Sequence, residues 1–225
     1  MSLSDLPDLT TLDKDGALEE AHDGLTRAGL IVAGSAGGLA LWRPASASAA
    51  KIPASDQDVL NYALVLEYLQ AAFYTESERA GALEGKAKKA ATTVGAVERA
   101  HVKAFRALLG KRAVGKPQFD FQGVTEDQKK FLKTAVAFED LAVAAYKGQA
   151  RRVKSKAVLR SALGIHTVEA RHAAWMRYLN GNIPATAAFD LPQTRPEINQ
   201  IVASTHFIVQ KKPKTSSRRK PRYTG

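Results

Sequence analysis

Four long segments with the hydrophobic period of an α-helix constrain this 225-residue chain more than any other feature. They cover about residues 55–81, 86–109, 125–148 and 155–179. Apolar residues recur every three or four positions in each segment, and the alternation that is typical of strands is scarce. Helices of roughly 22 to 26 residues are longer than the globular average and favour a helical bundle. We therefore predict an all-α fold.

The lengths of the connections predict how the four helices are joined. About four residues (82–85) link the first helix to the second, and a similarly short loop links the third to the fourth, so each pair is expected to form an antiparallel hairpin. The linker over residues 111–124 reaches about 46 Å when extended, whereas a 24-residue helix is about 36 Å long. We therefore predict a four-helix bundle with a long crossover between helices two and three. A simple up-and-down bundle with a loose loop is the alternative.

Capping signals predict where the helices begin. Ser55 is followed three residues later by Asp58 and is expected to cap the first helix, and Thr125 with Gln128 has the pattern of a capping box that opens the third. After the bundle, we expect residues 189–207 to form an ordered strap with a short helix from about Pro196.

Each predicted helix places a single glutamate near the middle of its apolar stripe. These residues are Glu67, Glu98, Glu139 and Glu169. The neighbours of Glu139 at three, four and seven positions, which share its face, are all apolar or aromatic. An ionised carboxylate that is buried without a partner costs many kcal/mol or takes up a proton. Four of them in one core therefore predict bound cations.

Two of the four helices add a histidine three residues after the glutamate, as Glu98 with His101 and Glu169 with His172. Residues at this spacing project from one face, so each helix can offer a bridging carboxylate and a terminal imidazole to one centre. Two divalent ions would cancel the charge of four carboxylates, and oxygen-rich ligation with imidazole suits Fe²⁺ or Mn²⁺. We therefore predict a site of six residues, which serve as metal ligands and as catalytic groups: Glu67, Glu98, His101, Glu139, Glu169 and His172.

Two other interpretations of these residues stay open. The glutamates could belong to surface salt-bridge ladders with the histidines filling the core, or the site could be a relic that binds no metal. Among the neighbours, we expect Tyr74 and Tyr146 to be core aromatics rather than electron relays, and Gln70 to line the bundle. Asp140 is expected at the boundary of the core, and His166 either bonds to a ligand or lies at the bundle edge.

Cysteine is absent from the sequence, and the charge is unevenly distributed. The lack of cysteine excludes disulfides, thiolate zinc sites, iron–sulfur or rubredoxin-type centres and a cysteine nucleophile. The formal net charge is +11, but seven of the 33 basic residues lie in the last fifteen positions, which hold no acid. We therefore divide the chain into a leader (1–50), a helical domain (55–208) and a basic, disordered tail (209–225).

The leader has features of an export signal. Residues 1–27 are acidic, residues 28–42 are uncharged and apolar, and the small-residue run 45–50 offers signal-peptidase sites. We expect export to the periplasm or cell envelope, with an uncleaved anchor, a non-targeting arm and a cytoplasmic protein as alternatives. The basic tail is expected to be a solubilising segment, with an anionic polymer or the envelope as its candidate partner and without specific nucleic-acid recognition.

The residues around the predicted site resemble the ferritin-like superfamily. The runs over residues 61–74 and 169–174 are similar to its branch of bacterial ferritin-like domain proteins, which includes the plant desiccation-related proteins. The segments 189–192 and 194–198 are similar to the strap that follows the bundle in that branch. The resemblance covers about residues 55–208, and all six site residues match. It implies a ferritin-like bundle and a dinuclear metal site, and it says less about the reaction.

Three functions follow from these expectations. The first is stress-related redox chemistry at a centre with two iron ions per chain, as a ferroxidase or as a consumer of peroxide, with O₂ or H₂O₂ as the oxidant. The second is a catalase-like oxidoreductase with two manganese ions per chain. The third is a non-catalytic, stress-protective binding protein that its metals only stabilise. A homodimer or a larger homo-oligomer is compatible with each of them.

Overall fold

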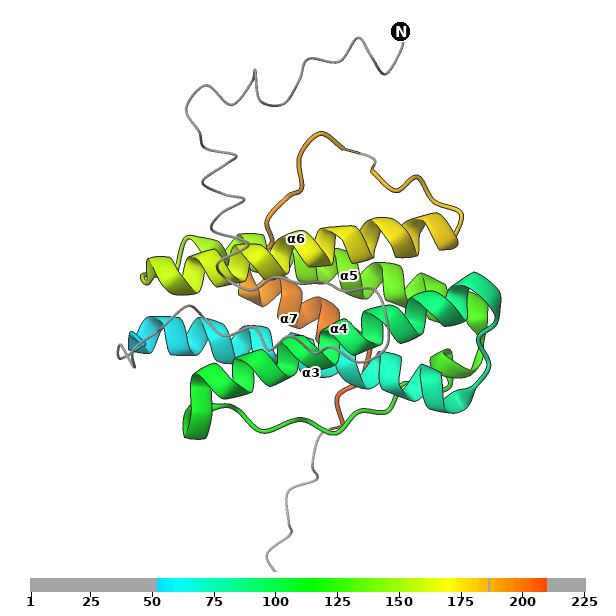
Figure 1. Ribbon diagram of the computed structural model, residues 1–225, viewed down its shortest axis with the longest axis horizontal. Coiled ribbons are helices and arrows are strands. Elements are labelled where there is room, and N and C mark those ends of the chain that lie inside the picture. Colours follow the sequence, from blue (N-terminus) through cyan, green and yellow to red (C-terminus); the bar gives the residue numbers. More distant parts are fainter. Residues whose placement is uncertain (1–51, 186, 210–225) are drawn as a thin grey trace, which may run out of the picture. The chain divides into compact units, whose positions relative to one another are not determined.

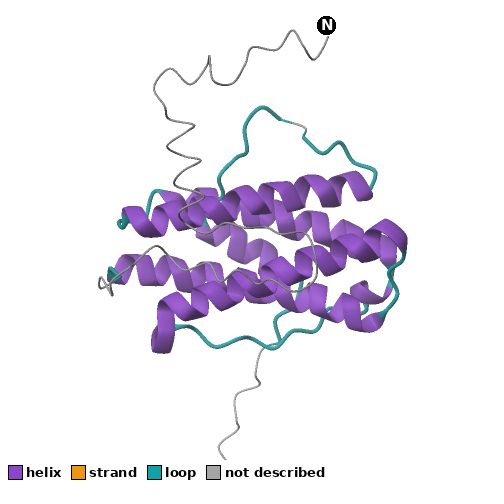
Figure 2. Cartoon of the chain, viewed as in Figure 1, coloured by secondary structure: helices purple, strands orange, loops and turns teal. Residues whose placement is uncertain are grey.

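The computed structural model describes residues 52–185 and 187–209, and this part of the chain is mostly helical (Figures 1 and 2). The four long helices are α3 (Ala54–Ala80), α4 (Gly85–Leu109), α5 (Gln128–Ala150) and α6 (Lys156–Leu179), and a short helix α7 (Arg195–Ser204) follows. The all-α prediction is confirmed. No helix within the described ranges is both long and apolar enough to cross a membrane. The predictions for the leader and for the tail beyond Val209 fall outside the described residues.

The helices form two hairpins that are joined by the predicted crossover. Short loops join α3 to α4 and α5 to α6, and in space α3 also contacts α5 while α4 contacts α6. Figure 1 shows the linker between α4 and α5, in green, running along the bundle so that α5 starts at the opposite end from the one where α4 stops. The long crossover is therefore confirmed over the alternative of a loose loop.

Specific hydrogen bonds hold the crossover against the helices. The side chain of Asn61 accepts from the backbone N–H of Val114 at 2.7 Å and donates to the carbonyl of Arg112 at 3.1 Å. Further along, Phe119 forms an antiparallel bridge with Ile208, which lies beyond α7. The strap and the crossover thus fix each other, although they are some 90 residues apart in the sequence.

Both predicted capping pairs are wrong in detail. Helix α3 starts one residue before Ser55. Helix α5 is capped by Asp127, whose carboxylate accepts from the N–H of Lys130 at 2.8 Å. The hydroxyl of Thr125 instead donates to Glu76 at 3.0 Å. The competing tertiary partner removes Thr125 from the cap and ties the turn before α5 to helix α3.

A buried aspartate of α3 fixes the turn that joins α5 to α6. Asp56, in the first turn of α3, is fully buried and accepts from the backbone N–H groups of Lys154 and Ser155, both at 2.8 Å. These two groups precede α6, so the carboxylate joins the first helix of one hairpin to the loop of the other. These two hydrogen bonds fix the position of the start of α6 along α3, and with it the relative positions of the side chains at the midpoints of these helices.

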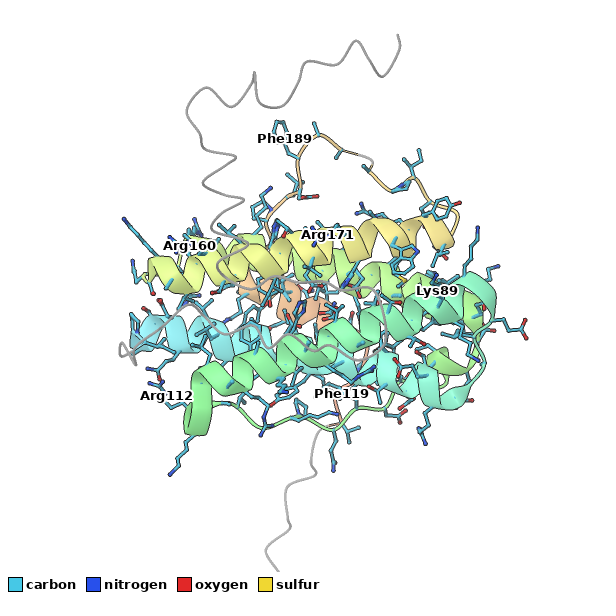
Figure 3. The ribbon with its side chains drawn as sticks, viewed as in Figure 1. Lys89, Arg112, Phe119, Arg160, Arg171 and Phe189 are labelled. Atoms are coloured by element: carbon cyan, nitrogen blue, oxygen red, sulfur yellow. The ribbon has the colours of Figure 1, made fainter. Side chains whose placement is uncertain are left out.

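Aromatic residues fill the core between α3, α5 and the strap. The rings of Phe73 and Phe131 stack with centroids 5.0 Å apart, and Phe121 meets Phe207 of the strap edge to face at 5.4 Å. Helix α7 lies over this core with Ile198 fully buried, so the predicted short helix is confirmed. The first part of the strap differs from expectation, because Phe189 is 80% exposed on an arch that leads away from the helices (Figure 3).

Candidate metal centre

All four predicted glutamates reach the interior. Glu67, Glu98, Glu139 and Glu169 lie near the midpoints of α3, α4, α5 and α6, and each has no exposed surface. The apolar stripe of each helix faces the bundle axis, and a residue in that stripe must therefore do the same. The interpretation as surface salt-bridge ladders is wrong for this chain. By contrast Arg171, between Glu169 and His172, projects outward from α6 (Figure 3).

The first histidine joins three of the carboxylates. The Nδ1 atom of His101 lies 3.2 Å from Glu67 Oε2, 3.2 Å from Glu169 Oε1 and 3.4 Å from Glu98 Oε2. Ligand atoms of these four residues all lie within 4.8 Å of one another. The group is therefore compact enough for its members to share a single ion.

The second histidine forms a matching group. The Nδ1 atom of His172 lies 2.9 Å from Glu98 Oε1 and 3.5 Å from Glu139 Oε2, and Glu169 completes a set whose ligand atoms again lie within 4.8 Å. Glu98 and Glu169 belong to both groups, whereas Glu67 and Glu139 belong to one each. Two overlapping groups with shared carboxylates match the pattern expected of a dinuclear site, in which the two helices with histidine supply the bridging carboxylates.

The contacting atoms lie at ion-pair distances from one another, but in positions that do not satisfy the geometry of a hydrogen bond. Glu67 Oε2, Glu169 Oε1, both oxygens of Glu98 and both Nδ1 atoms are buried and lack a hydrogen-bond partner within the described residues. A buried polar atom without a partner is costly, and such atoms are rare in proteins. Each of the two groups instead brings its ligand atoms within 4.8 Å of one another. The donor set of carboxylate oxygens and imidazole nitrogens thus fits divalent metal ions of the Fe²⁺ or Mn²⁺ kind.

Two tyrosines hold the outer oxygens of the carboxylates. Tyr74 on α3 donates to Glu139 on α5, and Tyr146 on α5 donates to Glu67 on α3. Each tyrosine follows a glutamate of its own helix by seven residues and bonds to the glutamate of the other helix, so the arrangement is nearly two-fold symmetric. The prediction that Tyr74 and Tyr146 are core aromatics is right about their burial, but it omits their hydrogen bonds to the glutamates. The repeated spacing of Glu and Tyr in both segments is the signal that could have revealed it.

Gln70 also belongs to the site. Its Nε2 atom donates to Glu139 at 3.2 Å and lies 3.4 Å from Glu169 Oε2. The prediction that Gln70 only lines the bundle is therefore incomplete. With the tyrosines and this amide in place, both oxygens of Glu139 accept hydrogen bonds, whereas Glu67, Glu98 and Glu169 each keep at least one buried oxygen without a partner among the described residues.

Without bound cations, protons would balance the charge of the site. Burial lowers the pKa of His172, but the carboxylates of Glu139 and Glu98 outweigh it and raise that pKa to about 10. Burial likewise opposes the charging of His101, yet the charge of Glu67 raises its pKa well above the ordinary value. Burial, reinforced by Glu98, raises the pKa of Glu169 well above its usual range. Cations would displace these protons on binding.

Asp140 and His166, the two neighbours considered in the sequence analysis, lie outside the centre. Asp140 pairs with Arg177 at 2.7 Å and is partly exposed, as expected of a boundary carboxylate. His166 is half-buried, and its Nε2 atom has no hydrogen-bond partner among the described residues. It thus fits the bundle-edge alternative. Among the six residues of the site, the two imidazoles alone have exposed surface: the His101 and His172 side chains are 12% and 9% exposed, while the glutamates are fully enclosed.

The fold and the site define a class: a helical-bundle protein with a buried carboxylate–histidine centre that could hold metal ions. A family model described as the ferritin-like domain matches residues 55–182, and the chain belongs to this family. A comparison with curated proteins finds no match. The ferritin-like identification made from residues 61–74 and 169–174 is thereby confirmed.

Proposed function

We propose that this protein is a ferroxidase, which binds two Fe²⁺ ions as substrates and passes their electrons to an oxidant. The observation that carries the proposal is the pair of overlapping ligand groups with Glu98 and Glu169 in common. Two ions that share bridging carboxylates are held close enough to deliver two electrons to one acceptor. With O₂ the reaction balances as two Fe²⁺, one O₂ and two protons giving two Fe³⁺ and one H₂O₂.

The residues of the chain supply binding, charge and order. The four glutamates carry a charge of −4 when ionised, which two Fe²⁺ ions neutralise, and this favours their transfer into an otherwise dry interior. The hydroxyls of Tyr74 and Tyr146 and the amide of Gln70 fix the carboxylates, so that little reorganisation accompanies the change of ionic charge. Ferrous ions reach the centre where the imidazole of His101 meets solvent.

The proposal is tested by mixing metal-free protein with Fe²⁺ in aerated buffer and following Fe³⁺ formation by absorbance. We expect oxidation faster than in buffer alone, and loss of this acceleration in Glu98→Gln, which keeps the side-chain shape but removes a charge shared by both groups. Glu126→Gln is the matched control, because Glu126 is exposed and belongs to neither ligand group. Oxidation by Glu98→Gln at the wild-type rate would refute the proposal.

The same samples separate the proposal from its two competitors. A dimanganese, catalase-like enzyme would evolve O₂ from H₂O₂ when loaded with Mn²⁺ and would not accelerate Fe²⁺ oxidation. A protein that its metals only stabilise would show a higher melting temperature with metal and neither reaction. Either of these results would replace the ferroxidase assignment.

A further inference from the structure

An apolar cavity lies beside the candidate centre, at the end of the bundle where α3 and α6 begin. Its volume is about 30 Å³, and all four long helices contribute to its wall. Leu66 and Ala145 on the inner wall and Val158 are buried, whereas Tyr62, Val153 and Ala162 are partly exposed. The cavity therefore extends from the surface of the bundle toward its interior. The cavity exists because alanines line it on α3, α5 and α6, and their side chains are too short to fill the space between the helices.

The cavity reaches the residues that hold the centre. Tyr146 forms part of its wall, and the hydroxyl of the same residue donates to Glu67. Leu66 precedes Glu67 in the chain, and Ala63 lies one helical turn before it. A molecule in the cavity is thus separated from the ligand carboxylates by little more than the Tyr146 ring.

The chemistry of the wall selects the kind of molecule that enters. Its exposed surface is almost wholly apolar. A cavity needs about 10–15 Å³ to hold one water molecule, so this one suits a guest of two or three heavy atoms. Two lining residues, Tyr62 and Gln149, each hold a buried polar atom without a partner within the described residues, so water or H₂O₂ could bond only to these two atoms. Its other hydrogen bonds would be lost on entry, at a cost of roughly 1–3 kcal/mol for each polar group, whereas an uncharged apolar diatomic loses nothing comparable. Small apolar cavities of proteins stay dry and bind apolar guests.

We propose that this cavity admits O₂ and holds it beside Tyr146, so that O₂ rather than H₂O₂ is the oxidant of the centre. The inference rests on the proposed ferroxidase function for its biological meaning, but the binding of an apolar guest does not depend on it. It also separates two routes of access. Ions would enter at the imidazoles of His101 and His172, and the apolar oxidant would enter between Tyr62, Val153 and Ala162.

The binding step is tested with xenon, an apolar atom, on metal-free protein. We expect a xenon peak in the cavity of a pressurised crystal and a shifted ¹²⁹Xe resonance in solution. Both signals should disappear in Ala162→Leu, whose longer side chain fills the cavity, and persist in Ala157→Leu, an exposed alanine of the same helix. Absence of xenon from the wild-type cavity would overturn the inference, as would an ordered water bound there by Gln149, whose buried Oε1 has no partner within the described residues.

The selectivity is tested by the dependence of Fe²⁺ oxidation on the concentration of oxidant. In Ala162→Leu we expect a several-fold higher KM for O₂ with the rate at saturating O₂ preserved, and no change when H₂O₂ replaces O₂. An unchanged KM for O₂ in a variant that has lost xenon binding would refute the route while leaving the ferroxidase proposal intact. If wild-type protein oxidises no Fe²⁺, the ferroxidase proposal fails, and the xenon result alone then decides whether the cavity takes an apolar guest.

Discussion

The division of the ligands into two overlapping groups predicts unequal effects of two similar substitutions. Glu98 belongs to both groups, whereas Glu67 belongs only to the group of His101. Both glutamates are fully buried, and glutamine preserves the size of each side chain. Glu67→Gln should therefore remove one bound ion, and Glu98→Gln should remove both.

The size of the effect follows from linkage between metal binding and folding. An ion present at a hundred times its dissociation constant stabilises the folded state by about 2.7 kcal/mol. For a domain of this size each kcal/mol shifts Tm by about 2–4 °C. Loss of one ion should therefore lower the metal-induced rise in Tm by roughly 5–11 °C, and loss of two independent ions by about twice that amount.

Calorimetry with and without Mn²⁺, together with elemental analysis of the dialysed protein, measures both quantities. Each variant is compared with its own metal-free form, so that any change in intrinsic stability cancels. The exposed Glu126→Gln should bind as much Mn²⁺ as the wild type. Equal metal content in Glu67→Gln and Glu98→Gln would show that the carboxylates are not shared as the geometry indicates.

Three further predictions follow from individual contacts. Tyr146→Phe removes the donor to Glu67, and it should destabilise the metal-free protein by about 1–3 kcal/mol and weaken Mn²⁺ binding in a titration. The control is Tyr68→Phe, which removes a hydroxyl that bonds to the crossover and should leave the Mn²⁺ affinity unchanged in that titration. His172 has a pKa near 6.5 when unfolded and about 10 when folded, so the stability of metal-free protein in urea should fall as pH rises across this window, and a rise would contradict the assignment. Asp56→Ala leaves the two backbone N–H groups before α6 without their acceptor and should cost about 3 kcal/mol in urea unfolding; full wild-type stability would refute the role of this contact.

The sequence by itself determined the helices and the six residues that meet at the centre. Helical periodicity is a local property, and a residue in the apolar stripe of its own helix must face the interior of any bundle built from that helix. The crossover also followed from local information, because the length of the linker over residues 111–124 limits where the third helix can begin. The absence of cysteine excludes thiolate chemistry whatever fold the chain adopts.

Only the tertiary structure decided which side chains meet across the helices. The bonds of Tyr74 to Glu139 and of Tyr146 to Glu67 depend on the offset between α3 and α5, which no spacing within one helix specifies. Thr125 left its predicted cap for a partner about fifty residues away for the same reason. The cavity beside Tyr146 exists because four separate chain segments fail to fill one space. Periodicity fixes the face that a residue presents, whereas the packing of whole helices fixes the atom that it touches.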